Sequence, residues 1–229
     1  MIFLLLPSAR AEWTAAAWLG GAHTNDTSLG LQIPALSTNL ALHPISYATR
    51  PFHSPIYYGY GAGWFFSRHF GFEAEFTHLK VYAETNRTAQ ISGTLRGAPI
   101  NETAVLDNIV QQFNITHGVN LLTASFAARK AFHGGGGSPR LIVSARAGGG
   151  ITIPHPENEV LGVSNSEHYQ VGSPVIQFAA GFEVRLWRRF YGITEVRYTR
   201  VGETVSIAQG NATSVLDTSH ATFGLAWHF

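Results

Sequence analysis

Between Tyr58 and Trp64, every second residue is aromatic or alanine, and each residue between them is glycine. The segment 176–186 alternates in a similar way, with apolar residues on one face and Gln177, Glu183 and Arg185 on the other. A period of two predicts β-strands whose side chains point to opposite faces in turn. Each of these strands therefore needs an apolar environment on one side and a polar environment on the other.

The composition indicates which environment that is. Charged residues make up 13% of the chain, against about 25% in ordinary soluble domains, while hydrophobic residues reach 45%. No stretch of the sequence approaches the roughly 20 consecutive apolar residues that a spanning helix requires. These features favour a membrane β-barrel, whose strands alternate between lipid and lumen. The net charge of +1, without a basic run, argues against a nucleic-acid partner.

Eight segments carry strand patterns, and their connections alternate between short and long. The segments are 12–22, 55–67, 70–83, 114–130, 140–152, 170–187, 191–203 and 219–229. The long connections are 23–54, 84–113, 153–169 and 204–218, and the three between them are short turns. This alternation of short and long connections predicts an all-β fold, namely a membrane-spanning antiparallel up-and-down β-barrel of eight strands. Such a barrel is expected in the bacterial outer membrane. The short turns and both termini are then expected in the periplasm, and the long loops outside the cell.

The polar faces of these strands carry both acids and arginines. An eight-stranded barrel is just wide enough for side chains to fill it, and buried charges must pair with one another. We therefore expect an interior ion-pair network, made by Glu73, Glu75, Arg129, Arg146, Glu183, Arg185, Glu195 and Arg197. Small inward residues such as Gly61, Gly63, Gly148 and Gly181 would leave space for these long side chains. A catalytic carboxylate pair is the alternative, but a network is favoured because no cleft is evident.

The first residues differ from the rest of the chain. A short apolar run, Ile2 to Leu6, precedes Ala9-Arg10-Ala11, which has the small-x-small form of a signal-peptidase site. The basic segment that opens a signal peptide is missing, so we expect this leader to be truncated. The predicted domains are a signal peptide over residues 1–11 and an outer-membrane barrel over residues 12–229.

The C-terminal segment carries the most specific pattern. Counting back from the last residue, Phe229, Trp227, Leu225 and Phe223 share one face of the predicted final strand. A terminal aromatic residue on an amphipathic strand resembles the C-terminal assembly signal of outer-membrane proteins. We therefore expect the barrel-assembly machinery to be a partner of these four residues.

Two predicted hairpins extend this resemblance. The segments GAGWFFSRHFGFEAEFTH (61–78) and AAGFEVRLWRRFYGITEVRYTR (179–200) resemble paired hairpins of the OmpA-like and opacity-type outer-membrane β-barrels. In that group a strand of the form aromatic-x-Glu-x-aromatic follows a short basic turn, and here Glu73 and Glu195 take the acidic place. The resemblance implies an eight-stranded barrel and specifies the fold better than the function.

Two Thr-His pairs, in FTHLKVY (76–82) and ITHGVNLL (115–122), raise the question of an enzyme. The strand register predicts His78 and Lys80 on the lipid-facing side near the outer interface, and His117 inside. We interpret His78 and Lys80 as contacts to lipopolysaccharide phosphates. A lipid A-modifying hydrolase would need an oriented hydroxyl and an acid partner as well, and no such triad is evident.

The remaining functional expectations are few. The spacings of the 11 histidines match no common zinc pattern, and cysteine is absent, so we expect no metal, no cofactor and no catalytic residue. The leading hypothesis is a monomeric, non-enzymatic barrel of structural or surface-interaction type, surrounded by outer-membrane lipids and lipopolysaccharide. A narrow porin and a lipid A-modifying hydrolase remain as alternatives.

The C-terminal pattern can be tested directly. Deleting Phe229 removes about 1.5–3 kcal/mol of apolar burial, which a finished barrel can survive. If the residue is an assembly signal, the deletion should lower accumulation in the outer membrane, whereas detergent-refolded protein should still give a heat-modifiable band on a gel. Normal accumulation of the shortened chain would contradict the assignment.

Overall fold

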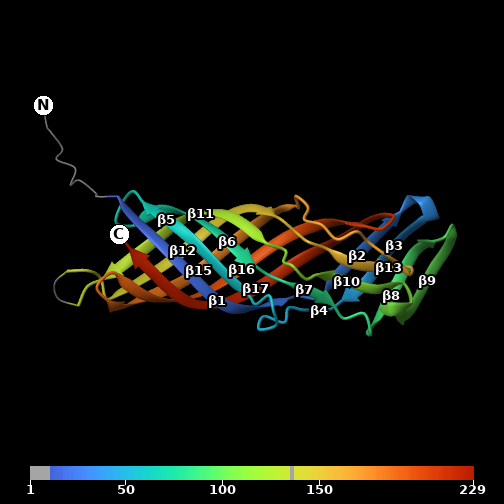
Figure 1. Cartoon of the computed structure of the whole chain (residues 1–229), viewed down its shortest axis with the longest axis horizontal. Coiled ribbons are helices and arrows are strands. Elements are labelled where there is room, and N and C mark those ends of the chain that lie inside the picture. The colour runs from blue at the N-terminus through green and yellow to red at the C-terminus, as the bar shows by residue number, and fades with distance from the viewer. Residues whose placement is uncertain (1–10, 135–136) are drawn as a thin grey trace, which may run out of the picture.

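The computed structural model describes residues 11–134 and 137–229, so residues 1–10 of the predicted signal peptide lie outside the described residues. Within the described part, eight antiparallel strands form a barrel (Figure 1). They are β1 (Glu12–Thr24), β5 (Tyr58–Phe65), β6 (Phe70–His78), β11 (Leu121–Phe132), β12 (Leu141–Thr152), β15 (Pro174–Trp187), β16 (Phe190–Ile207) and β17 (Gly210–His228). The predicted all-β, eight-stranded barrel is confirmed.

The first and last strands close the barrel. β1 pairs with β17 over eleven residue pairs, from Thr14 opposite His228 to Thr24 opposite Thr218, and β1 also pairs with β5. Both described chain ends lie at one end of the barrel, with the short turns between its strands (Figure 1). This closure leaves no unpaired strand edge in the barrel wall, which is the condition for a β-structure to span lipid.

The barrel wall is apolar outside and polar inside. Side chains that point outward include Tyr60, Phe72, Phe126, Phe178 and Val196, all between 45% and 62% exposed. The predicted C-terminal face follows the same pattern, since Phe223, Leu225, Trp227 and Phe229 are 46–57% exposed. Water would solvate such a belt unfavourably, so the barrel is a membrane-spanning one. No helix in the described part of the chain is long and apolar enough to cross a membrane.

The four long connections, predicted as loops, contain strands that continue the β-structure. We call this part the distal extension: it comprises the strands outside the barrel and the ends of β16 and β17 beyond residue 200. Four strands extend the barrel sheet from β17, namely β2 (Thr27–Ile33), β3 (Thr38–Ile45), β8 (Thr88–Leu95) and β9 (Ala98–Val105). A second sheet holds β4 (Tyr47–Ala48), β7 (Val81–Ala83), β10 (Val110–Ile115), β13 (Glu157–Val160) and β14 (Val163–Ser164). Two 3-10 turns, η1 (Pro34–Leu36) and η2 (Leu106–Asn108), connect these strands.

The distal extension has a hydrophobic core of its own. Leu29 and Leu31 of β2, Leu42 of β3 and Ile91 of β8 are completely buried there. Phe113 of β10 is also buried, so both sheets contribute to one core. The alternating apolar residues Leu29, Leu31 and Ile33 are the sequence signal for the buried face of β2.

Strand β16 shows where the membrane-spanning part ends. In its barrel half, Val196 points outward, while Glu195 and Arg197 point inward. Beyond residue 200 the inward residues Val201, Val205 and Ile207 are apolar and buried, with the buried Glu203 between them bound to the Thr152 hydroxyl, and the outward residues Thr204 and Ser206 are polar. The same strand therefore changes from lipid outside and charges inside to water outside and a mainly apolar core inside. That change of faces places the membrane boundary near residue 200.

The last predicted strand, 219–229, is longer than expected because β17 begins at Gly210, and two other predicted strands each divide into two observed ones. The segment 114–130 consists of the end of β10 and most of β11, which belong to different sheets, with a turn between them. His117 lies in that turn and is exposed, so its predicted inward position is corrected. The segment 70–83 likewise divides into β6 and β7.

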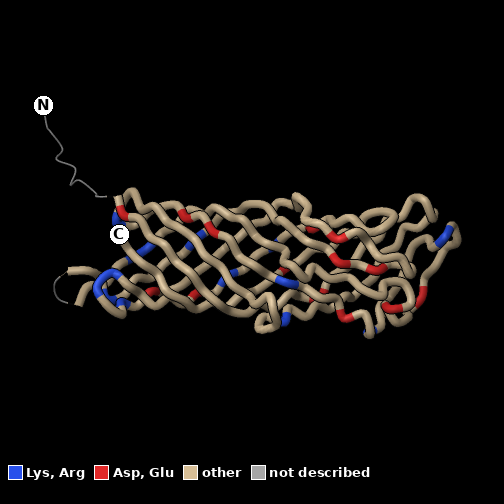
Figure 2. The backbone as a smooth tube through the Cα atoms, viewed as in Figure 1, with Lys and Arg blue, Asp and Glu red and all other residues tan. Residues whose placement is uncertain are grey.

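The two ends of the molecule differ in charge. Basic residues gather at the turns near the termini, and acidic residues are prominent on the distal extension (Figure 2). Arg188 and Arg189, for example, form the turn between β15 and β16, whereas Glu157 and Glu159 lie on β13.

The change of faces along β16 predicts that a lysine on its outward face lowers the unfolding free energy by different amounts on the two sides of the membrane boundary. Val196→Lys places a charge on the lipid-facing surface and should lower the unfolding free energy by about 2–4 kcal/mol. Thr204→Lys, on the outward face of the distal part of the same strand, should change it by no more than about 0.5 kcal/mol. Urea titration of both variants in lipid vesicles gives the comparison, and equal losses would contradict the proposed boundary.

Candidate functional site

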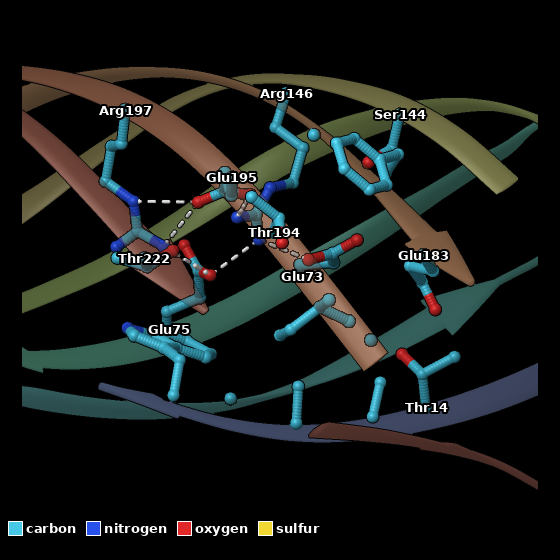
Figure 3. Close-up of a pocket in the computed structure, with 18 of the residues that line it drawn as sticks. Thr14, Glu73, Glu75, Ser144, Arg146, Glu183, Thr194, Glu195, Arg197 and Thr222 are labelled. Carbon is cyan, nitrogen blue, oxygen red and sulfur yellow. Dashed lines mark hydrogen bonds and ion pairs between the residues drawn. The ribbon is translucent and has the colours of Figure 1, made fainter. Parts of the chain in front are cut away.

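The centre of the lumen is occupied by the guanidinium group of Arg146 on β12 (Figure 3). Its Nη1 donates to the carboxylates of Glu73 and Glu75 on β6, at 2.5 Å in the case of Glu75 Oε1. Its Nη2 donates to Glu195 Oε2 on β16. One planar donor group thus joins three strands, as a guanidinium can because it presents several N–H groups in a fixed fork.

A second guanidinium completes this central cluster. Arg197 donates from Nη2 to Glu195 Oε1 at 2.8 Å and to Glu75 Oε1 at 3.2 Å. Its Nη1 donates to Thr77 Oγ1 at 2.9 Å, and its guanidinium lies 5.2 Å from the ring centre of Trp18. The carboxylates of Glu75 and Glu195 each contact both arginines, which makes the central cluster one connected network.

The strand register explains how three glutamates fit into so narrow a lumen. Each faces a glycine on the neighbouring strand, since Gly63 is opposite Glu73, Gly61 is opposite Glu75, and Gly181 is opposite Glu195. A Cβ atom added to any of these glycines would lie 3.1 Å from a side-chain carbon of the glutamate that it faces. Glycine on one strand therefore makes the space that the acid on the next strand uses.

The central cluster holds two guanidinium groups and three carboxyl groups, so with all three ionised it carries an excess of one negative charge. The side chains of Arg146, Arg197 and Glu75 are 7%, 1% and 2% exposed, so water compensates little of it. Gln177 donates its amide to Glu75 Oε2 at 2.7 Å and adds a hydrogen bond on the acidic side. Removal of one partner from such a cluster leaves a buried charge uncompensated, which is far costlier than the loss of an exposed ion pair.

A second cluster lies at the end of the lumen near the termini. Arg129 on β11 donates to Glu12 Oε2 on β1. The two ring nitrogens of His228 lie 2.7 Å from Glu12 Oε1 and 2.7 Å from Glu183 Oε2. Because a carboxylate only accepts, both nitrogens must carry hydrogen, and His228 is held as an imidazolium. Its charge and that of Arg129 balance Glu12 and Glu183.

The structure thus divides the predicted interior residues into three groups. Glu73, Glu75, Arg146, Glu195 and Arg197 meet in the central cluster, and Arg129 and Glu183 meet in the terminal one. Arg185 lies in neither: its Nη1 donates to the Ser138 carbonyl at 2.7 Å, in the turn between β11 and β12.

Glu12 and His228 were not among the predicted interior residues. Both lie at strand ends, on β1 and β17, where a short stretch of alternation does not reveal the face. The signal that could have identified them is the pairing of first and last strand that any closed barrel requires.

The predicted lipopolysaccharide contacts need correction. His78 is 4% exposed, stacks on Tyr58 with ring centres 5.2 Å apart, and is covered by the turn that holds Asn120. Lys80 is 2% exposed, and its Nζ donates to the His53 carbonyl at 2.7 Å. The strand pattern suggested an outward direction, but the distal extension folds over both side chains, so neither lies on the outer surface.

The lumen leaves little room for a substrate or an ion path. The cavity beside the central cluster measures about 60 Å³ and is lined by Thr14, Glu73, Ser144 and Glu195, among others. Such a volume accommodates a few water molecules. In the described part of the chain, the side chains that converge as metal ligands lie elsewhere, at His117, His155 and Glu167 in the distal extension.

Comparison with known proteins identifies the fold. No family model and no curated protein matches the sequence. Among solved structures, the chain is similar to the outer membrane protein OprG from Pseudomonas aeruginosa, with a TM-score of 0.53 at 9% identity over 96% of this chain and 97% of that one.

Two further structures are similar at lower scores. The Neisserial surface protein A has a TM-score of 0.42 at 11% identity, over 96% of each chain. The outer membrane protein AlkL, solved in lipid bilayers, has a TM-score of 0.45 at 10% identity, over 100% of this chain and 95% of that one. The likeness to OprG shows the fold alone. Closed barrels with an apolar belt and a polar lumen are outer-membrane structures, and this chain is accordingly an outer-membrane β-barrel.

The central cluster predicts a large effect for one arginine. Arg146→Ala leaves three carboxylates without their shared partner and should lower the unfolding free energy by on the order of 3–5 kcal/mol. Arg185→Ala removes the same side chain from outside both clusters and should cost less than about 1 kcal/mol. Denaturant unfolding in micelles measures both, and similar losses would show that the central cluster does not stabilise the barrel.

Proposed function

We propose that the chain is a non-enzymatic, non-conducting membrane anchor that presents its distal extension outside the cell as a contact surface. The observation that carries this proposal is that the path through the molecule is closed twice. Arg146 and Arg197 cross the lumen together with the glutamate carboxylates that they bind. The apolar core around Leu31 and Leu42 fills the distal end. The part of the chain left to meet a partner is the outer surface of the distal extension.

A narrow porin is the second candidate, and the packing of the lumen argues against it. A conducting barrel needs a continuous water path, whereas here the inward side chains of β6, β12 and β16 contact one another directly. The buried residues Leu29, Ile91 and Phe113 would have to separate before water could cross the distal end.

An enzyme is the third candidate, and one hydroxyl–histidine pair in the structure invites the comparison. Thr116 Oγ1 donates to Glu157 Oε2 at 2.9 Å and lies 3.2 Å from His117 Nδ1. In a catalytic triad the histidine stands between the hydroxyl and the acid. Here the hydroxyl stands between the acid and the histidine, so it is bound to the acid and is not activated as a nucleophile. We therefore favour the non-enzymatic proposal over a lipid A-modifying hydrolase.

Within this proposal, we assign the chain to the OmpA-like and opacity-type barrels that the two hairpins resemble. The Glu73 hairpin and the Glu195 hairpin both supply carboxylates to the central cluster, which supports that assignment. We further propose a monomer, because β1–β17 pairing closes the barrel within one chain. Outer-membrane lipids, lipopolysaccharide and the barrel-assembly machinery are its proposed surroundings, without a nucleic-acid partner.

Electrical recording separates the anchor from the porin. The purified chain in a planar bilayer should give no stable single-channel steps, because the central cluster and the distal core both block the lumen. Reproducible steps from the wild-type chain would favour the narrow porin instead. We also expect the mass of lipid A to be unchanged in cells that express the chain, because a lipid A-modifying hydrolase would change it.

Labelling of intact cells tests the proposed orientation. An epitope inserted after Ala208, in the turn between β16 and β17, should be accessible to antibody on intact cells. The same epitope inserted after Ser138, in the turn between β11 and β12, should become accessible only after the outer membrane is permeabilised. The reverse pattern would place the distal extension in the periplasm and would exclude its role as an outer contact surface.

A further inference from the structure

Three side chains in the distal extension converge on one point although they come from separate segments. His117 lies in the turn between β10 and β11, His155 lies between β12 and β13, and Glu167 follows β14. One ligand atom from each lies within 4.8 Å of the others. We propose that these residues bind a divalent transition-metal ion of the zinc class, with two imidazole nitrogens and one carboxylate oxygen as ligands. This site is independent of the lumen clusters and of the proposed anchoring role.

The hydrogen bonds around His117 prepare its ring for this purpose. The Thr116 hydroxyl donates to Glu157 Oε2, so towards His117 Nδ1, at 3.2 Å, its oxygen can only accept. Nδ1 of His117 therefore carries the hydrogen, and Nε2 keeps its lone pair. Zinc-binding histidines are commonly oriented in this way, with the second nitrogen donating to an outer group. Glu157 and Thr116 form that outer group here.

The neighbouring imidazoles contain nitrogen atoms without partners. Among the described residues, the buried Nδ1 of His155 and the buried Nε2 of His78 form no hydrogen bond. The His155 ring is packed between those of His117 and Tyr169, with ring centres 4.6 Å and 4.7 Å away. Buried polar atoms without partners cost free energy. A cation bound by Nδ1 of His155 would remove this cost for that atom.

His78 lines a cleft beside the proposed site and shares His117 with it. The Asn120 amide Nδ2 donates to the carbonyls of His117, Gly118 and Ile153, which fixes its orientation. Asn120 Oδ1, 2.8 Å from His78 Nδ1, must then accept a hydrogen from that nitrogen. The lone pair of His78 is consequently on Nε2, and the His78 side chain lines the same cleft as His117, Asn120 and Tyr169. His78 is 96% buried, so this lone pair is held there by the fold.

The charge and ligand types decide which ion fits. The segment 153–173 carries Glu157, Glu159 and Glu167 and no lysine or arginine, so a cation is favoured. Two imidazoles and one carboxylate suit zinc and its neighbours better than calcium or magnesium, which prefer oxygen ligands. Tetrahedral ligands about 2.0–2.1 Å from zinc lie about 3.4 Å apart, so ligand atoms that lie within 4.8 Å of one another need to approach by at most about 1.4 Å. His117 and Glu167 are exposed and can make that adjustment by rotation of their side chains.

Metal binding by the purified chain tests the proposal. The full-length chain, folded in detergent micelles without a histidine tag and stripped with a chelator, is dialysed against zinc chloride, and bound metal is measured by mass spectrometry. One zinc ion per chain is expected. His117→Ala and His155→Ala should each weaken binding more than tenfold, and Thr116→Val, which removes only the outer hydroxyl, should weaken it about 10-fold to 100-fold. Cobalt chloride should give the visible absorption of a tetrahedral site.

The controls use the same residue types away from the site. His133→Ala, in the turn near the termini, and Glu102→Gln, on β9, should leave zinc binding unchanged, and Glu167→Gln should weaken it. Heat-modifiable gel mobility shows that each variant is folded. The proposal is overturned if the wild-type chain retains no zinc, or if His117→Ala and His155→Ala bind it as tightly as His133→Ala does.

Discussion

The structure depends on the pairing of β1 with β17. A strand edge in lipid would expose backbone N–H and C=O groups that nothing there can satisfy, so a spanning sheet must close on itself. Thr14 opposite His228 and Thr24 opposite Thr218 mark the two ends of that closure. Closure also creates the lumen, and an eight-stranded lumen is so narrow that the inward side chains must fill it. The polar clusters inside follow from that restriction.

A filled lumen accounts for the choice of residues inside it. Polar side chains there cannot be solvated freely, so each must find partners on other strands. Arginine suits this position because one guanidinium reaches several carboxylates, as Arg146 does with strands β6 and β16. Glycine opposite each of the three glutamates is the complementary requirement. The glycines along the inner wall therefore provide the space into which the charged side chains pack.

Alternation along each strand was sufficient to predict the barrel, but it missed the inward Glu12 and His228 and did not show which inward residues would meet. Whether a residue stands at an odd or an even position in its strand identifies the face to which its side chain points. Its depth in the lumen depends on the stagger between strands. For this reason Arg129 and Glu183 were grouped with Arg146 but lie in a separate cluster with Glu12 and His228. The positions of His78 and Lys80 depended on the folding of distant segments over them. A strand pattern carries no information about such coverage.

The change of faces near residue 200 connects the lumen to the distal extension. A strand that leaves lipid must exchange an apolar outer face for a polar one, and its inner face is then free to become apolar. In β16 and β17 the inward residues change from Arg197 and His220 to Val201 and Leu216 within a few positions. The large apolar core forms beyond this change, and it orders the connections into sheets. Ordered connections can hold side chains from separate segments at fixed places, as they hold His117 beside His155, which irregular loops could not do without a large loss of conformational entropy.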